Sequence, residues 1–429
     1  MTPDATSQRW TALSRRAAIR LRALAGELQT SVTRIALKNN HCMNERDNKF
    51  QKLIWSLPWL VRYPFWRVRN LLGGEDDSES ESHLIFVVAN HFEPAWTKNG
   101  TQMELRTQIT RLEDWCKKAE ALGRAVHDSD GTPFRHTNFY PAEQYQKQLL
   151  DRLAALQAEG FGEVEIHLHH GVDRPDTPEN LRRVITDFRD ILAEEHKCLA
   201  RWNGSGPKYA FVHGNWALAN SSGGKYCGVD SEMKILAETG CYADFTLPAA
   251  PNQAQVPRLN AIYQCGYPLE QRAPHRNGPE VKLGSAPVLP VIFTGPLVFN
   301  WQRRIGGVPV PRLDDGVLAA NYPPDLARLE RWRGARIGVK GLGEWVFIKL
   351  TCHGFVNEDQ PAMIGDPMRR FLEETIHLSA KTNKFKVHFA SAREAFNMVL
   401  AASDGLRGEP GQYRNYRLRQ IMEKPETVE

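Results

Sequence analysis

The 429-residue sequence lacks several features that would assign a class of protein at once. Its seven cysteines include no CxxC pair and their number is odd, so we expect reduced thiols and a cytoplasmic protein rather than a disulfide framework. No apolar run approaches the roughly 20 residues that a membrane-spanning helix requires. The GxSxG, GxGxxG and GxxxxGK[ST] patterns are also absent, so the sequence gives no support to a serine hydrolase or a nucleotide-phosphate loop.

An excess of positive over negative charge is found only at the start of the chain. Residues 1–72 hold 13 Lys and Arg against 4 Asp and Glu, a net charge of +9, and the remainder has a net charge of −4. A nucleic-acid groove in the main domain is therefore not expected. The aromatic and basic stretch 50–72 predicts a helical extension that packs on the domain or on a partner subunit, or that lies at a membrane surface, where Trp would lie at the headgroups and Arg would reach phosphates.

Changes in composition divide the sequence into four parts. Residues 1–74 form the basic, aromatic, helical extension, and residues 75–83 form an acidic, Ser-rich linker. The body covers 84–404 and contains a loop-rich insertion at about 248–320, rich in Pro, Gly and Asn. The tail, 405–429, is polar.

Short apolar strands alternate with helical patterns along the body, which predicts an α/β domain with a parallel sheet. The first run, Leu84 to Ala89, is apolar throughout, as in a strand covered on both faces. Thr177 followed by Pro178 marks a helix start, and Gly240 marks a helix end. Further strands are expected at 163–169, 209–213, 241–246, 345–353 and 385–389, and helices at 101–123, 141–159, 177–198, 229–239, 322–336, 366–380 and 391–403.

Histidines and carboxylates follow the apolar strands at the points where the strands end. These polar residues are Asn90, His91 and Glu93, then His169 and His170, then His213, and finally His353. Glu165, His167 and His169 share one face of their strand. The carboxyl ends of parallel strands meet at one edge of a sheet or barrel, so we expect a site there. Such a residue set suits a divalent metal, most simply zinc, that activates water for hydrolysis.

The body resembles the polysaccharide deacetylases of carbohydrate esterase family 4 and the wider glycoside hydrolase/deacetylase barrel superfamily, over about 84–400. Glu165-Ile166-His167-Leu168-His169 matches the first half of the family's Glu-Ile-x-x-His-x-x-x-His motif, and Leu350-Thr351-Cys352-His353 resembles its late Leu-x-His motif. Met233 to Asp244 is similar to the family's helix–Gly–strand passage. The resemblance implies an incomplete (β/α)7 TIM-like barrel and metal-dependent removal of an acyl group, usually N-acetyl, from a sugar.

The resemblance also implies roles for individual residues. The metal ligands would be His91, His169 and Asp173, with His167 as a neighbour on the same face. Asn90 replaces the aspartate that serves the family as general base, so Glu93 is expected to act as base. His353 would be the acid that protonates the leaving amine. Substrate contacts are expected at His213, Trp216 and Asp244.

Two other functions remain open on the sequence. A glycoside hydrolase on the same barrel would need two carboxylates facing the sugar, and Glu93 with Asp173 or Asp244 are the candidates. A catalytically silent carbohydrate-binding protein of a polysaccharide pathway is the third hypothesis, because an amide at Asn90 cannot take a proton from water.

Overall fold

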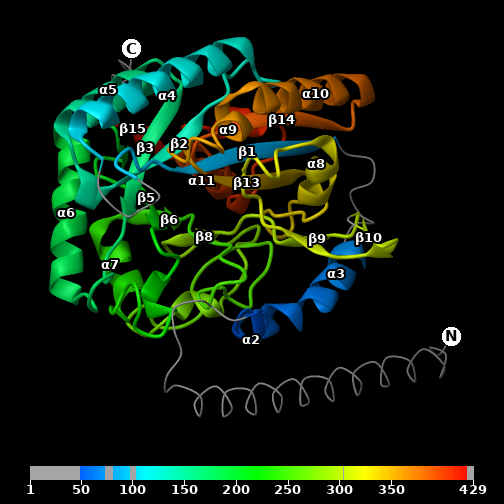
Figure 1. Ribbon diagram of the computed structural model, residues 1–429, viewed down its shortest axis with the longest axis horizontal. Coiled ribbons are helices and arrows are strands. Elements are labelled where there is room, and N and C mark those ends of the chain that lie inside the picture. The colour runs from blue at the N-terminus through cyan, green and yellow to red at the C-terminus, as the bar shows by residue number, and fades with distance from the viewer. Residues whose placement is uncertain (1–48, 73–80, 97–102, 303, 423–429) are drawn as a thin grey trace.

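A computed structural model describes residues 49–72, 81–96, 103–302 and 304–422. The first 48 residues of the predicted extension, most of the predicted linker and the end of the tail lie outside the described residues. The described chain is a mixed α/β structure built on one nine-stranded sheet (Figure 1). Neighbouring strands pair in parallel throughout this sheet, except that β7 runs antiparallel to β8. The predicted α/β class and mainly parallel sheet are thus confirmed.

The sheet places strands that are far apart in sequence side by side. β1 pairs along one edge with β13, and along its other edge with β14 at its start and β2 at its end. In spatial order the strands are β13 (Trp345–His353), β1 (Ser82–His91), β2 (His136–Pro141), β3 (Gly162–Leu168), β5 (Tyr209–His213), β6 (Cys241–Asp244), β8 (Val291–Phe293) and β7 (Ile262–Tyr263), with β14 (Phe385–Ala390) also on β1.

Both faces of β1 are buried, which explains its unbroken apolar sequence. Ile85 and Val87 pack into one hydrophobic cluster, while Leu84 and Phe86 pack into the other. Successive side chains alternate between these faces. At the end of the strand, Asn90 and His91 therefore point to opposite sides of the sheet, so only one of them can face a given site.

Helices surround the sheet in Figure 1 and follow the predicted strand–helix alternation. Thr177 caps α6, its hydroxyl accepting from Asn180 N at 3.3 Å, and Gly240 ends α7 at a φ of 102°. Both predicted helix signals are confirmed. The body helices are α4 (Leu105–Ala125), α5 (Lys147–Ala158), α6 (Pro178–Glu194), α7 (Glu232–Thr239), α8 (Leu326–Arg333), α9 (Pro361–Ile364), α10 (Asp366–Thr382) and α11 (Ala392–Ser403).

Two segments differ from the sequence expectations. The sequence pattern gave no strand between the first two helices, but His136–Pro141 forms β2, whose polar His136, Thr137 and Asn138 are buried. The polar tail continues the fold as far as β15 (Leu418–Gln420), which pairs with β4 (Ala200–Trp202). Within the irregular region 248–320, the short strands β9 (Val298–Asn300) and β12 (Arg312–Asp314) pair with each other, as do β10 (Arg304–Ile305) and β11 (Val308–Pro309).

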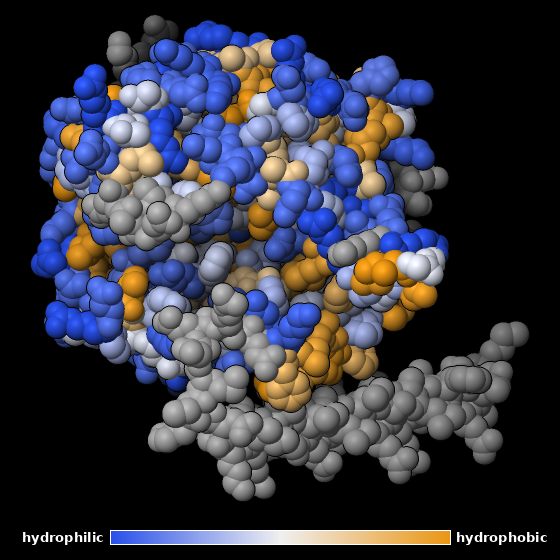
Figure 2. Space-filling view, viewed as in Figure 1, coloured by the Kyte–Doolittle hydropathy of each residue, from blue (hydrophilic) through white to orange (hydrophobic). Residues whose placement is uncertain are grey.

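The extension supplies two further helices, α2 (Lys49–Leu60) and α3 (Tyr63–Leu72), which pack on the body. Trp59 and Trp66 are buried, and Trp59 stacks on Phe299 with ring centroids 5.8 Å apart. The opposite face is apolar and exposed, and orange residues gather there and over the β10–β11 hairpin in Figure 2. Its exposed residues are Phe50, Leu53, Val61, Phe65, Val68, Leu71 and Leu72. None of the described helices combines the length and apolarity needed to cross a bilayer.

Candidate metal centre at the carboxyl ends of the strands

Three strand ends bring histidines together, as the sequence pattern predicts for parallel strands. β1 and β13 pair in register so that His91 lies opposite His353, and their rings stack at 4.5 Å. The His91 ring also meets the His167 ring of β3 edge-on at 4.7 Å. His169, just beyond β3, lies 4.6 Å from His167, ring to ring. With Glu93, these four histidines form what we call the open cluster, because His169 and His353 are partly exposed.

Glu93 lies at the centre of the open cluster. Its Oε1 is 3.2 Å from His167 Nε2 and 3.1 Å from His169 Nε2. The other ring nitrogen of each histidine is already engaged, His167 Nδ1 by the Val212 carbonyl at 3.0 Å and His169 Nδ1 by Glu143 at 2.6 Å. Those contacts fix the orientation of each ring, so that its Nε2 faces Glu93.

A glycine makes room for His169. A Cβ on Gly214, the first residue after β5, would lie 2.2 Å from the His169 ring. Any larger residue at this position would therefore displace the imidazole from Glu93 and Glu143. This contact explains why the chain carries glycine directly after His213.

The pKa shifts in the open cluster leave His91 neutral and Glu93 ionised, which are the forms in which these residues bind metal. Burial, followed by the neighbouring His353 and His167, holds the pKa of His91 well below its usual range, and His91 Nδ1 has no hydrogen-bond partner in the described part of the chain. Burial alone would raise the pKa of Glu93, but hydrogen bonds from His167 and His169 bring it well below its usual value. Burial likewise opposes the charged form of His169, and Glu143 with Glu93 nevertheless raises its pKa to about 10.

The residues present fit a divalent metal ion. One ligand atom from each of His91, Glu93 and His167 falls within 4.8 Å of the others, and all three residues are buried. Nitrogen and carboxylate ligands at about 2.0–2.2 Å suit zinc and similar ions. Three protein ligands with His169 and His353 on the exposed side correspond to a site that keeps a position open for water or substrate.

Two residues predicted for the site lie elsewhere. Asn90 points to the opposite face of β1, where its amide donates to Asn138 Oδ1 at 3.1 Å and accepts from Gly354 N at 2.9 Å. It ties three strands together and does not face the histidines. Asp173 lies on the loop after β3 with its side chain exposed, outside the ligand groups of the described chain.

The three predicted substrate residues lie at the ends of β5 and β6. His213 is fully buried, and its ring is 4.9 Å from that of His170. Trp216 has a φ of 58° and packs partly on the core. The Asp244 carboxylate accepts from Thr246 Oγ1 at 2.7 Å, and burial raises its pKa to about 7.

The sequence reasoning missed several functional groups. Glu143 orients His169 from the turn after β2, the strand that the sequence pattern did not reveal. Lys349 of β13 is buried, donates to the Leu247 carbonyl at 2.9 Å, and has a pKa that burial lowers to about 7. Cys227 and Glu232 join His170 and His213 in a second ligand group, which we call the buried cluster. In the sequence, Lys349 stands out only because it is a charged residue inside an apolar strand.

Comparison with known proteins adds no assignment. No protein-family model matches the sequence, and no curated protein is significantly similar to it.

Proposed function

We propose that this chain is a metal-dependent hydrolase that removes an acyl group, most simply N-acetyl, from a sugar or polysaccharide. The observation that carries the proposal is the convergence of His167 Nε2 and His169 Nε2 on one oxygen of Glu93 at a partly exposed sheet edge. The strand-end motifs support the choice of an acylated sugar, and they are compatible with the incomplete (β/α)7 barrel that we propose for the mainly parallel sheet. The described cysteines carry free thiols, which supports the proposed cytoplasmic location.

The geometry divides the work among the residues of the open cluster. His91, Glu93 and His167 would hold the metal, which we propose to be zinc. A zinc ion there would lower the pKa of a water and polarise the acyl carbonyl. Glu93 fits the role of ligand better than that of base, because two imidazoles already converge on its Oε1.

Proton transfer then falls to the two histidines on the exposed side. His169 is held by Glu143, as a general acid or base is held by an orienting carboxylate. His353 stacks on His91 beside it. These two groups lie beside the metal ligands and are placed for proton transfer, and the motif resemblance implies that His353 protonates the leaving amine.

Metal content and acetate release test the proposal together. The purified full chain should carry metal in the open cluster, and His167→Ala should lower the metal content by one equivalent. Wild type should release acetate from acetylated oligosaccharides, and His353→Ala should lose most of that activity. His377→Ala, on the exposed side of α10, is the matched control and should change neither. Unchanged metal content in His167→Ala would overturn the proposal.

The two alternatives give different results in the same assay. A glycoside hydrolase would shorten the oligosaccharide without releasing acetate. The structure offers this reading less support, because Glu93 is engaged by histidines and Asp244 by Thr246. A silent binding protein would retain the oligosaccharide on a column and turn over no substrate.

We also propose that the exposed face of α2 and α3 contacts an anionic membrane surface. Neither helix contains an acidic residue, and Lys52 and Arg67 are exposed beside the apolar side chains. This combination suits a helix lying in the headgroup region. The full chain should sediment with vesicles containing phosphatidylserine, and Phe65→Ser should weaken that binding several-fold. Equal sedimentation of the two proteins would refute the contact.

A further inference from the structure

The buried cluster lies beside the open cluster but is enclosed by protein. His170 follows His169 in the loop after β3, His213 ends β5, and Glu232 begins α7. Cys227 lies in the loop between β5 and α7. All four residues are buried, and the side chains of His213 and Glu232 are 0% exposed. One ligand atom from each falls within 4.8 Å of all the others.

The distances within the buried cluster are close to the edges of a tetrahedral site. Bonds of about 2.0–2.3 Å place the ligand atoms of a zinc site about 3.3–3.8 Å apart. His170 Nε2 is 3.2 Å from Glu232 Oε1, and His213 Nε2 is 4.0 Å from the same oxygen. Cys227 Sγ is 3.4 Å from Glu232 Oε2.

Outer contacts orient two of the ligands. His170 Nδ1 is 3.0 Å from Asp176, whose other oxygen accepts from Thr177 N and Asn180 Nδ2, both at 2.8 Å. A carboxylate on the far nitrogen is the arrangement that fixes a metal-binding imidazole. Glu232 Oε2 accepts from Ala219 N at 2.5 Å, which leaves Oε1 facing the histidines.

A second, independent observation comes from His213. Its Nε2 is fully buried and has no hydrogen-bond partner in the described part of the chain, although it faces Glu232. A buried polar atom without a partner is costly unless it binds something. Asn215 N approaches Nδ1 at 3.3 Å. Binding of a cation at Nε2 moves the ring proton to Nδ1 and gives up only that long contact.

Glycines allow the two loops that carry the ligands to meet. A Cβ on Gly171 would lie 2.2 Å from the Cys227 carbonyl oxygen, and one on Gly228 would lie 2.6 Å from Pro175. Asp176 N then donates to Cys227 O at 2.8 Å. The close approach brings the thiol to the histidines.

We propose that His170, His213, Cys227 and Glu232 bind a structural zinc ion, distinct from the metal of the open cluster. A thiolate with two imidazoles favours zinc over magnesium or calcium. Four protein ligands in a closed site are typical of structural rather than catalytic zinc. Binding converts the Cys227 thiol to a thiolate and releases its proton to solvent.

The ion would fix the segment between β5 and α7, which includes non-glycine residues in the left-handed region. Trp216, Ala219, Asn220 and Tyr226 all have positive φ. Such residues persist when the surroundings over-determine them, and a metal cross-link supplies that constraint. Because Gly214 in this segment makes room for the His169 ring, the buried zinc would also help to hold the open cluster in place.

Sulfur identifies this site, since the other ligand groups of the described chain contain no cysteine. The experiment replaces zinc by Co²⁺ in the full chain carrying Cys42→Ser, because Cys42 lies outside the described residues. We expect a thiolate-to-cobalt charge-transfer band in the near ultraviolet. The band should persist in Glu93→Gln, because this variant changes only the open cluster. The test therefore remains valid even if the proposed hydrolase function fails.

Three variants complete the test. Cys227→Ala should lose the band and one equivalent of metal, whereas Cys198→Ala, another buried cysteine, should keep both. Asp176→Asn should weaken metal binding about 10–100-fold. Absence of the band from folded, cobalt-loaded protein, or unchanged metal content in Cys227→Ala, would overturn the proposal. The first of these measurements needs only the Cys42→Ser protein, so it does not depend on the folding of a variant with a change in the buried cluster.

Discussion

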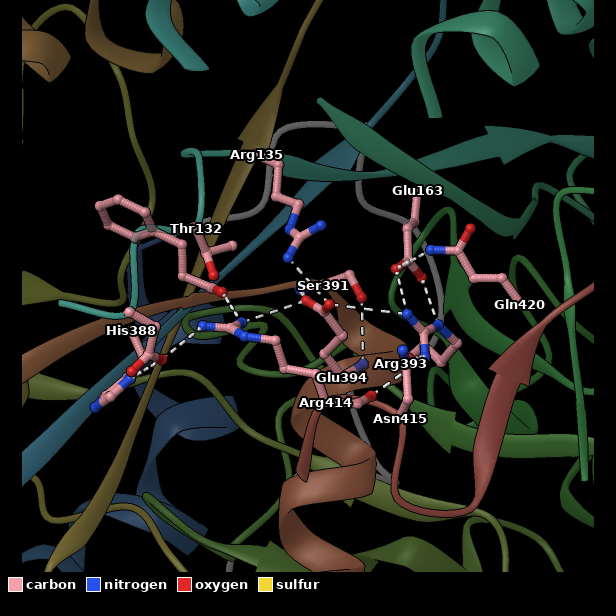
Figure 3. Close-up of polar contacts among 12 residues, drawn as sticks. Thr132, Arg135, Glu163, His388, Ser391, Arg393, Glu394, Arg414, Asn415 and Gln420 are labelled. Atoms are coloured by element: carbon pink, nitrogen blue, oxygen red, sulfur yellow. Dashed lines mark hydrogen bonds and ion pairs between the residues drawn. The ribbon is translucent and has the colours of Figure 1, made fainter. Parts of the chain in front are cut away.

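The two ends of β3 carry ionisable side chains on one face, but these side chains have different partners. At the amino end, Glu163 forms a paired ion bridge with Arg393 of α11, at 2.8 and 3.1 Å, and also accepts from Gln420 at 2.8 Å (Figure 3). At the carboxyl end of the same face, His167 Nε2 points at Glu93 and toward the open cluster. The same face of β3 thus carries a fully hydrogen-bonded ion pair at its amino end and a candidate metal ligand at its carboxyl end.

The contrast extends beyond β3. Near the amino ends, Glu394 pairs with Arg135 at 3.0 Å and with Arg414 at 3.5 Å, and Arg414 pairs with Asp128 at 2.9 Å (Figure 3). These buried charges join the C-terminal segment to the strand starts. At the carboxyl ends, histidines converge instead on the carboxylates of Glu93 and Glu232. The amino end is therefore organised for stability and the carboxyl end for binding.

The largest effect should follow from a change in the open cluster. Glu93→Gln keeps the shape of the side chain but removes the charge on which two imidazoles converge. Losing several kcal/mol of metal-derived stabilisation should lower kcat/KM on the order of 10³-fold. In the presence of a chelator, the free energy of unfolding should fall less than when a buried ion pair of the amino end is broken, because Gln can still hydrogen-bond the two imidazoles. Acetate release measures kcat/KM, and urea unfolding measures the free energy of unfolding. Full activity of Glu93→Gln would contradict the assignment of metal binding to the carboxyl ends of the strands.

The next largest effect should be a loss of stability caused by a change at the amino ends of the strands. Arg393→Met leaves Glu163 buried without its main partner, and removal of one member of a buried pair destabilises a protein by about 3–5 kcal/mol. The double variant Glu163→Gln/Arg393→Met should recover much of that loss. Metal content and the kcat/KM of the folded protein should stay at wild-type levels. A loss of stability below about 1 kcal/mol would show that this ion pair does not anchor α11.

A histidine at the amino end should behave as a stability group rather than a ligand. His136 begins β2 against Trp115 and Phe134, its Nε2 has no partner in the described residues, and burial lowers its pKa to about 4. The native state therefore resists protonation while the unfolded state accepts a proton near pH 6.5. Stability present above pH 6.5 is lost as the pH falls toward 4, by roughly 2–3 kcal/mol.

His136→Phe tests this assignment. The variant should remain folded at pH 7, and its free energy of unfolding should fall less than that of wild type between pH 6.5 and pH 4.5. Urea titrations at the two pH values measure the difference. An unchanged pH dependence would remove His136 from the acid-sensitive groups.

The sequence predicted most of the long elements and the edge where the site forms, for physical reasons that can be stated. Apolar strands buried on both faces and helices with caps leave clear local patterns, as in β1, β13 and α6. The register of parallel strands then brings His91 beside His353 without further information.

What the sequence could not supply depended on contacts between distant residues. β2 is polar because its Asn138 bonds with Asn90, so it lacks the apolar signature of a strand. Glu143 was missed for the same reason, because it lies in the turn directly after β2. Strand alternation places Asn90 away from the histidines, although it occupies the motif position at which the family has its general base. Cys227 and Glu232 meet His170 only through the close approach of two loops, and no local spacing encodes that approach.

The smallest effect should come from Asp173. Its contrast with Asp176, on the same loop, separates a residue that orients a ligand from one that does not. Asp173 is exposed, whereas Asp176 contacts His170 Nδ1 at 3.0 Å. Asp173→Ala should therefore leave metal content and acetate release unchanged and alter the free energy of unfolding by no more than about 0.5 kcal/mol. Metal analysis of Asp173→Ala beside Asp176→Asn provides the measurement. If Asp173→Ala lost a metal ion, the ligand role implied by the motif would be restored, and the loop would have to move Asp173 inward when the ion binds.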